Sequence, residues 1–289
     1  MQSTPKINPE LLLAGVIALR ATSFIFSKML LAELDSFNLL SLRFLFAFAL
    51  LLLIFRRRLK HLNKKTMISG ILIGTLFFFT MSFEMAALKQ ADSSLVSLLE
   101  NCSIIIVPIL EAILLRRMMG RTEICSALIA MIGVVCLALS QGRLSGGMTL
   151  GLLAAFCYAV AIIVTAKYSR EASDPLLIGI VQVGTMGILS LTAALLRGGY
   201  HLPQTGVQWT YLAVLTIVCT GFGFTLQPVA QSRVSAERAG LFCAISPAVA
   251  NLLGVLVLHE RVTPLSILGL VLILFSIAFP HMKRRSSPA

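Results

Sequence analysis

Long apolar runs separated by short polar joints make up almost the whole chain. A helix needs about 20 mostly apolar residues to cross the hydrocarbon core of a membrane. Breaking the chain at its charged or Gly- and Pro-rich joints gives ten runs of about this length. Because the joints are short, we predict an all-α integral membrane protein with ten transmembrane helices and no separate soluble domain. The predicted helices cover 11–30, 38–55, 67–88, 95–115, 123–140, 147–166, 175–196, 208–228, 239–258 and 264–280.

The composition agrees with a membrane protein. Hydrophobic residues make up 57% of the 289 residues and charged residues 12%, whereas a soluble domain has about 45–50% apolar and about 25% charged residues. All six cysteines lie inside apolar runs, without the spacing of a zinc site or a disulfide framework. We therefore interpret them as small buried apolar residues, and the sequence predicts neither a metal site nor a cofactor.

The net charge of +12 raises the question of nucleic-acid binding. The basic residues gather in short joints between apolar runs, most densely in RRRLKHLNKK at 56–65. Such joints are usually cytoplasmic, because Lys and Arg are enriched in the loops that stay on that side of the membrane. Most Lys and Arg residues fall on one side of the ten predicted helices when both termini are placed in the cytoplasm. We therefore predict that orientation, and no nucleic-acid partner.

The two halves of the chain resemble each other. Residues 87–120 align without a gap with 230–263, and DSF at 35–37 aligns with DPL at 174–176. Five helices per half is an odd number, so the second half enters the membrane from the opposite side. The sequence thus predicts two inverted five-helix repeats, at 1–145 and 146–289. In secondary transporters of this architecture the substrate site lies near the middle of the membrane, where the repeats meet.

The region AGLFCAISPAVANLLGVLVLHERVTPLSILGLVLILFSI at 239–277 resembles the EamA-type branch of the drug/metabolite transporter superfamily. It has an Ala-rich start, a proline within the helix at Pro247, the pair Glu260-Arg261 and Gly269 in the last helix. ALKQADSSLVSLLENCSIIIVPI at 87–109 resembles the first copy of the same pattern. The resemblance implies ten membrane helices, no bound cofactor and transport of small metabolites, often outward. It also implies a multi-pass protein of the plasma membrane, which in a bacterium is the inner membrane.

The first half departs from the family pattern at two places. Arg116 and Arg117 stand where the second half has His259 and Glu260, and Pro108 comes four residues later than the repeat predicts. A role tied to the acidic residue of this motif is therefore not expected in the first half.

Polar residues inside the predicted helices are the candidate site. A charge at the centre of a membrane helix costs about 2.5–3.5 kcal/mol on insertion scales, so such residues normally face a protein interior or a water-filled cavity. In SLLENCSIIIVPILEA at 97–112, one helical face carries Ser97, Glu100, Asn101, Pro108 and Glu111, which is typical of a helix that lines a cavity. The predicted substrate-binding residues are Arg20, Arg43, Glu84, Glu100 and Asn101 in the first half and Tyr158, Gln182, Gln227, Ser246 and Asn251 in the second.

These residues make one wall of the predicted cavity charged and the other neutral and polar. This asymmetry favours an amine-bearing or zwitterionic ligand, with its carboxylate toward Arg20 and its ammonium toward Glu100. A protonated Glu100 would also allow proton-coupled exchange, although facilitated diffusion needs no such group. The alternative for Arg43 is a fixed ion pair with Glu84 or Glu100.

The leading functional hypothesis is a secondary transporter that exports small metabolites, such as amino acids or other amines, by alternating access. A membrane-embedded enzyme is disfavoured, because the sequence lacks a metal cluster, a nucleophile elbow, a P-loop and a dinucleotide motif. A translocase for lipid-like substrates or a non-transport membrane protein remains the alternative. The expected partners are a small-molecule substrate and the lipid bilayer, with the protein a monomer or a homodimer.

Overall fold

A computed structural model describes residues 9–114, 121–140, 146–198, 200–234, 239, 242, 245–259 and 263–285, apart from some individual side chains in α6, α7, α13 and α14. The described residues form helices joined by turns and short connections, without a strand. The predicted all-α architecture is therefore confirmed for this part of the chain.

Each predicted apolar run coincides with helical structure. Five runs are single uninterrupted helices. They are α3 (Ser36–Phe55), α4 (Lys64–Leu88), α7 (Arg121–Ser140), α8 (Gly146–Glu171) and α9 (Pro175–Leu196). The last run is also one helix, α14 (Pro264–Arg285), and α13 (Ile245–Leu258) occupies the later part of the ninth.

Three runs are interrupted helices. The first divides at Thr22, and the fourth divides after Glu100; the eighth contains a π-helix. A short 3₁₀ helix, η1 (Arg58–His61), follows α3. The segments of the three interrupted runs are α1 (Pro9–Ala21) and α2 (Ser23–Leu30) in the first; α5 (Ser93–Glu100) and α6 (Ser103–Leu114) in the fourth; and α10 (Gly206–Val214), the π-helix η2 (Leu215–Phe224) and α11 (Thr225–Gln231) in the eighth.

Seven helical stretches of the described chain are long and apolar enough to cross a membrane. They correspond to the first four and the sixth to eighth predicted helices. Shorter apolar helices lie at 245–258 and 264–276. The full number of ten membrane helices and their inverted repeat stay predictions.

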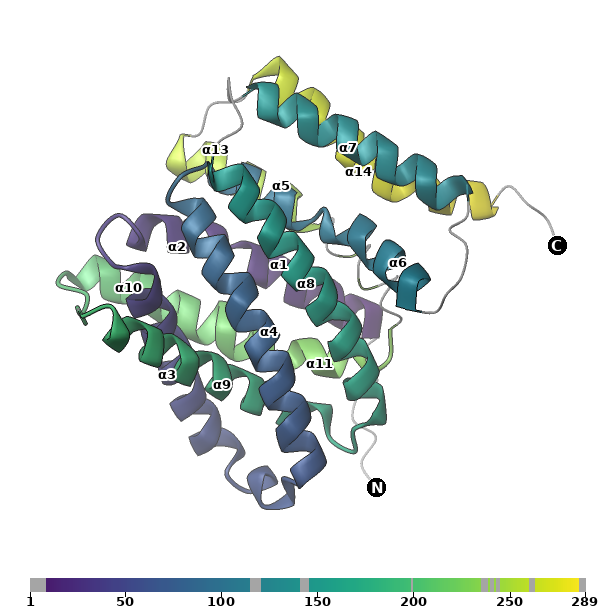
Figure 1. Ribbon diagram of the computed structural model, residues 1–289. Helices are drawn as coiled ribbons and strands as arrows, with labels where there is room; N and C mark the ends of the chain where they lie inside the picture. Colours follow the sequence, from purple (N-terminus) through teal and green to yellow (C-terminus); the bar gives the residue numbers. More distant parts are fainter. Residues whose placement is uncertain are drawn as a thin grey trace.

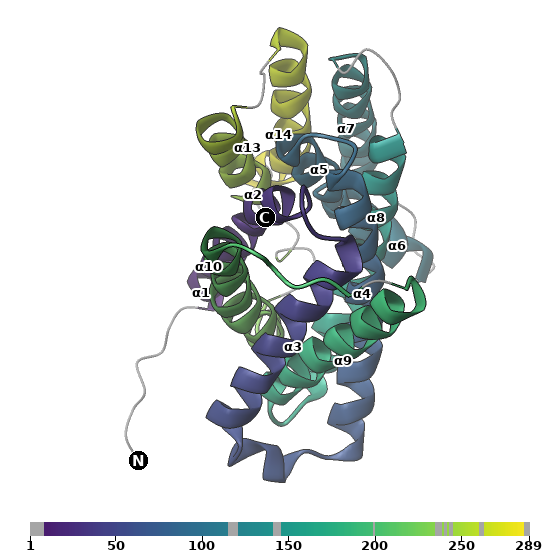
Figure 2. The same ribbon diagram turned by 90° about the vertical axis from the view of Figure 1, so that its left-hand side faces the viewer.

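The helices form a bundle with a helix pair along one edge (Figure 1). Helix α4 crosses the middle of the bundle and packs against α8 and α9, while α3 packs against α9. Helices α7 and α14 pack on each other and lie side by side at the top of both ribbon views (Figures 1 and 2). Both carry exposed apolar side chains such as Leu128 and Val271, as expected of helices that face lipid.

Contacts at glycines show the direction in which neighbouring helices pack. Gly184 of α9 lies against Phe48 of α3, and Gly187 lies one turn further on against Leu45. Successive residues of α9 therefore contact α3 in the reverse order of its sequence, so the two helices are antiparallel. A similar approach brings Gly74 of α4 against α9. Glycines allow such close contact because they have no Cβ.

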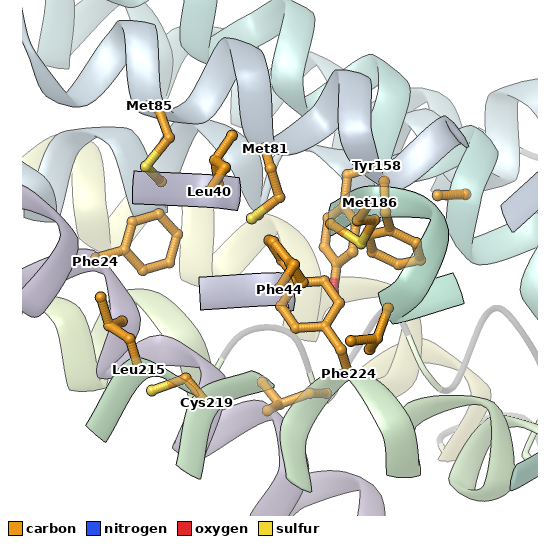
Figure 3. Close-up of a cluster of buried hydrophobic side chains, with 14 of the residues drawn as sticks. Phe24, Leu40, Phe44, Met81, Met85, Tyr158, Met186, Leu215, Cys219 and Phe224 are labelled. Atoms are coloured by element: carbon orange, nitrogen blue, oxygen red, sulfur yellow. The ribbon is translucent and has the colours of Figure 1, made fainter. Parts of the chain in front are cut away.

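The core between these helices is rich in aromatic and sulfur-containing side chains. Figure 3 shows Phe44 beside Phe224, with Met81, Met186 and Tyr158 around them. The rings of Phe44 and Phe224 meet edge to face, with centroids 5.3 Å apart. This arrangement places the negative ring face against a positive ring edge, and it brings α3 and η2 together beside the polar residues described below.

Two aspartates begin corresponding helices in the two halves with the same contact. Asp35 precedes α3 and accepts a hydrogen bond from the backbone N–H of Phe37 at 3.0 Å. Asp174 precedes α9 and accepts one from the N–H of Leu176 at 3.1 Å. Both satisfy a backbone donor that the first turn of a helix leaves unpaired. DSF and DPL, which align in sequence, thus form the same N-cap.

Replacing Asp35 with alanine is expected to lower the free energy of unfolding by about 0.5–2 kcal/mol, the usual effect of losing an N-cap. Burial raises the pKa of Asp35, but hydrogen bonds from Phe37 and Lys89 outweigh it, so the net pKa lies below its ordinary value. The Asp35 contribution should therefore be present above the unfolded pKa of about 3.9 and be lost as the pH falls through the folded pKa. Thermal unfolding of the detergent-solubilised protein measures both effects.

Asp92→Ala is the matched control, because Asp92 precedes α5 without a side-chain hydrogen bond to its N-terminus. Its partly exposed ion pair with Lys28 adds little, since such pairs contribute about 0–1 kcal/mol. Equal unfolding temperatures for the Asp35 and Asp92 variants would show that the N-cap of α3 is not important for stability.

Candidate substrate-binding site

A pocket with polar walls lies inside the bundle between residues of both halves of the chain. Its lining comes from α1, α2, α4 and α5 before residue 145, from α8 and α13 after it, and from Asn101, which follows α5. The lining side chains are Ile17, Arg20, Ser23, Phe24, Met81, Glu84, Glu100, Asn101, Tyr158 and Ser246. Charged residues that lie far apart in the sequence thus meet within one apolar bundle.

Arg20 lies on one side of the pocket and is held by the second half of the chain. Its Nη1 donates to Gln227 Oε1 at 2.6 Å and to the Tyr158 hydroxyl at 3.1 Å. The guanidinium carbon lies 4.1 Å from the centre of the Phe224 ring. A cation over an aromatic face is stabilised by the ring quadrupole. These contacts hold a buried positive charge at the pocket.

Glu84 of α4 and Glu100 of α5 form a carboxyl pair in the pocket. Both side chains line the same pocket, and both residues are at least 96% buried. Glu84 Oε1 and Glu100 Oε2 have no hydrogen-bond partner among the described residues.

Asn101 adds a third acceptor oxygen to the same wall. Its Nδ2 donates to the backbone oxygen of Ser97 at 2.7 Å, which commits the amide nitrogen to the helix. Its Oδ1 is buried and has no hydrogen-bond partner in the described part of the protein. Ser97 and Ser246, whose hydroxyl oxygens are 3.3 Å apart, connect α5 to α13 next to this wall. The pocket thus presents acceptors where a donor-rich group would be bound.

Arg43 is fully buried but lies outside the pocket lining. Its Nε donates to Thr220 Oγ1 at 2.6 Å, and its guanidinium contacts the rings of Phe44 and Phe224. Among the described residues, Arg43 Nη1 and Nη2 have no hydrogen-bond partner, so Arg43 is not hydrogen-bonded to Glu84 or Glu100. The cause is the orientation of α3, which turns Arg43 toward η2.

The structure brings together most of the residues that the sequence singled out. Gln227 reaches the site through Arg20, whereas Gln182 is fully buried in α9 away from the lining and has no side-chain hydrogen bond to a described residue. Asn251 belongs to α13, and its side chain lies outside the described residues. The predicted residues that line the pocket are Arg20, Glu84, Glu100, Asn101, Tyr158 and Ser246. Their role in binding a substrate stays a prediction.

Two aromatic residues at the site are not among the predicted substrate-binding residues. Phe224 lies under both Arg20 and Arg43, and Phe77 contacts Arg20 and the Tyr158 ring. Phe224 ends the π-helix η2, and π-helical turns are frequent at functional sites. Phe77 belongs to FFF at 77–79, which the sequence alone does not distinguish from packing or lipid-facing residues.

Comparison with known proteins identifies the family to which the chain belongs. The model of the EamA-like transporter family matches residues 8–139 and 145–280. The chain belongs to the EamA-like transporter family. This EamA protein is therefore a member of the drug/metabolite transporter superfamily and a multi-pass membrane protein, and the family resemblance inferred from the sequence is confirmed.

Relatives of this EamA protein carry the same general description. It is 24% identical over 287 residues to an uncharacterized transporter of Archaeoglobus fulgidus, covering 98% of this chain and 88% of that one. It is 25% identical over 203 residues to the uncharacterized transporter YdfC of Bacillus subtilis, covering 68% and 64% of the two chains. These similarities favour a transporter rather than an enzyme.

The fold of this EamA protein also resembles a solved structure. A crystal structure described only as that of a protein superposes with a TM-score of 0.73, covering 96% of this chain and 99% of the other at 18% identity. At this identity the likeness concerns the fold alone.

Proposed function

We propose that this membrane transporter exports small amine-containing metabolites, such as amino acids, by alternating access. The observation that carries the proposal is the pocket, which has a buried guanidinium on one side. On the other side are three acceptor oxygens without a hydrogen-bond partner among the described residues. The guanidinium of Arg20 suits a carboxylate. The oxygens of Glu84, Glu100 and Asn101 suit an ammonium group, which has three donors and no acceptor.

The pattern of helix packing supports two inverted halves, 1–145 and 146–289. In an inverted repeat, the second helix corresponds to the seventh and the fifth to the tenth. Helices α3 and α9, which are the second and seventh, pack together in antiparallel directions, and α7 packs on α14. The third helix, α4, contacts the sixth helix, α8. In an inverted repeat this pair corresponds to the eighth and first helices, and η2 of the eighth contacts α1 of the first. Exchange of the two halves thus reproduces the main contacts.

Alternating access follows from this pseudo-symmetry. Two similar halves with opposite orientations have two arrangements of comparable energy, one open to each side of the membrane. The pocket is lined from both halves, so movement of one half against the other would expose it alternately. We place both termini in the cytoplasm of a bacterial inner membrane, in agreement with the basic joint at 56–65. The functional unit is a monomer or a homodimer.

Flux measurements in proteoliposomes test this function. Liposomes that contain the purified protein and are loaded with an unlabelled mixture of the common amino acids should accumulate labelled amino acids faster than protein-free liposomes. The accumulation should saturate with concentration, because a binding site limits it. Linear uptake equal to that of protein-free liposomes would contradict amino acid transport.

A further inference from the structure

The joint between α3 and α4 carries the densest group of cations in the sequence. It lies at the lower end of both ribbon views, where the chain turns from α3 into α4 (Figures 1 and 2). Orientation in the membrane alone does not require this density, because the joint at 167–174, which is predicted to lie on the same side, carries two cations and two acids. The exposed cations of the joint are Arg56, Arg57, Arg58, Lys60, Lys64 and Lys65.

Acidic residues of the second half neutralise only two of these cations. Arg58 Nη1 lies 3.4 Å from Asp174 Oδ2, and Lys65 Nζ lies 2.9 Å from Glu171 Oε2. The other four cations form no ion pair with any residue that the structure describes. We call these four the basic patch: Arg56, Arg57, Lys60 and Lys64.

The backbone under the basic patch is folded, so the patch has a defined shape. The 3₁₀ helix η1 turns the chain, and Leu59 and Leu62 pack against the hydrophobic core. Asn63 then begins α4, because its side chain accepts a hydrogen bond from the backbone N–H of Thr66 at 2.8 Å. The apolar residues of the joint are thus held inward, while its cations stay exposed.

The first turn of α4 adds to the positive charge. It contains Lys64 and Lys65 and no acidic residue. The N-terminus of a helix carries a partial positive charge of its own, so an anion stabilises it and a lysine does not. Glu171 offsets one of these two lysines. An anion from outside the chain would offset the other.

Exposed apolar side chains continue from the basic patch along both helices. Leu53 and Ile54 in the last turn of α3 are 73% and 60% exposed, and Ile68 near the start of α4 is 56% exposed. In a membrane protein such side chains face the acyl chains of lipids. Cations next to a lipid-facing apolar surface match an amphiphile with a negative headgroup better than a small soluble anion.

We propose that the basic patch binds the phosphodiester headgroup of an anionic phospholipid, whose acyl chains lie along the exposed apolar residues of α3 and α4. The phosphate oxygens accept charge-assisted hydrogen bonds from the guanidinium and ammonium groups. This lipid site is separate from the substrate pocket, and it does not depend on which substrate the protein transports.

Native mass spectrometry of the detergent-solubilised full chain counts the bound lipids. We expect the wild-type protein to bind phosphatidylglycerol in preference to phosphatidylcholine with the same acyl chains at the same concentration. The double variant Arg56→Gln, Arg57→Gln should bind phosphatidylglycerol about 25-fold more weakly, because each cation near an anionic lipid surface contributes about fivefold in affinity.

The double variant Lys167→Gln, Arg233→Gln is the matched control. Both residues are exposed cations on the same predicted side of the membrane but lie outside the basic patch. The control removes the same amount of charge, so its affinity for phosphatidylglycerol should stay within about twofold of the wild-type value. An equal loss of affinity in both double variants would show a general effect of net charge and would overturn the lipid site.

The wild-type protein alone decides the outcome if the patch variant does not fold. Equal binding of phosphatidylglycerol and phosphatidylcholine would overturn the inference. Displacement of phosphatidylglycerol by inorganic phosphate at the same concentration would show a site for small anions and would overturn it as well. These measurements do not involve flux, so a failure to transport amino acids would contradict the proposed function and leave the lipid site standing.

Discussion

Replacing Arg20 with methionine is expected to lower amino acid flux at least about tenfold. The substitution keeps a long apolar side chain but removes the charge, the hydrogen bonds to Tyr158 and Gln227, and the stacking on Phe224. A hydrogen bond to a charged group contributes about 1.5–3 kcal/mol, and about 1.4 kcal/mol is a tenfold change in affinity. The measurement is the initial rate of flux at equal amounts of protein in liposomes.

Arg20→Lys is the informative companion to this variant. Lysine keeps the positive charge but lacks the planar group that stacks on Phe224 and donates in two directions. We therefore expect an intermediate flux. If Arg20→Met folds, as judged by size-exclusion chromatography, and transports at the wild-type rate, then Arg20 does not bind the substrate.

Replacing Gly179 with alanine is expected to prevent stable folding or to reduce the unfolding temperature strongly. A Cβ at this position would collide with the carbonyl oxygen of Thr225 and lie 2.9 Å from its Cα. These are backbone atoms of α11, so they cannot move aside as a flexible side chain would. Overpacking usually costs about 1–3 kcal/mol, and a backbone collision belongs at or above the upper end of that range. The readout is monodispersity and thermal unfolding in detergent.

Gly15→Ala is the matched control for Gly179→Ala. Gly15 is also helical, but a Cβ there would have no atom within 4 Å apart from those of its own helix. We expect it to leave stability nearly unchanged or to raise it slightly, because alanine is the better helix former. If both variants unfolded at the wild-type temperature, the close packing of α9 on α11 would be contradicted.

The helices could be predicted from hydrophobic runs, but their interruptions could not. The eighth run reads as an ordinary apolar helix, yet residues Leu215–Phe224 are π-helical. The difference between α- and π-helical hydrogen bonding depends on what packs against the helix, here α1 and α3. The division of the fourth run into α5 and α6 after Glu100 could not be predicted for a similar reason, because the sequence has no proline or glycine at that point.

Polar residues in apolar helices were a good guide to the pocket, because their burial demands an interior position. Depth along the helix was a weaker guide. Counting 1.5 Å per residue from the outer ends of the helices puts Arg43, Glu84 and Glu100 at a common level, and the structure places the two glutamates in one pocket. Arg43 lies elsewhere because the rotation of α3 about its axis, which a residue count does not reveal, directs it to Thr220.

The most direct test of the account is a comparison of metabolites in the medium of cells that express the wild type or Glu100→Gln at equal levels in the membrane. The account predicts that a small set of amine-containing compounds accumulates outside cells with the wild-type protein and not outside cells with the variant. Equal accumulation with both proteins would contradict the claim that the pocket around Glu100 binds the transported substrate.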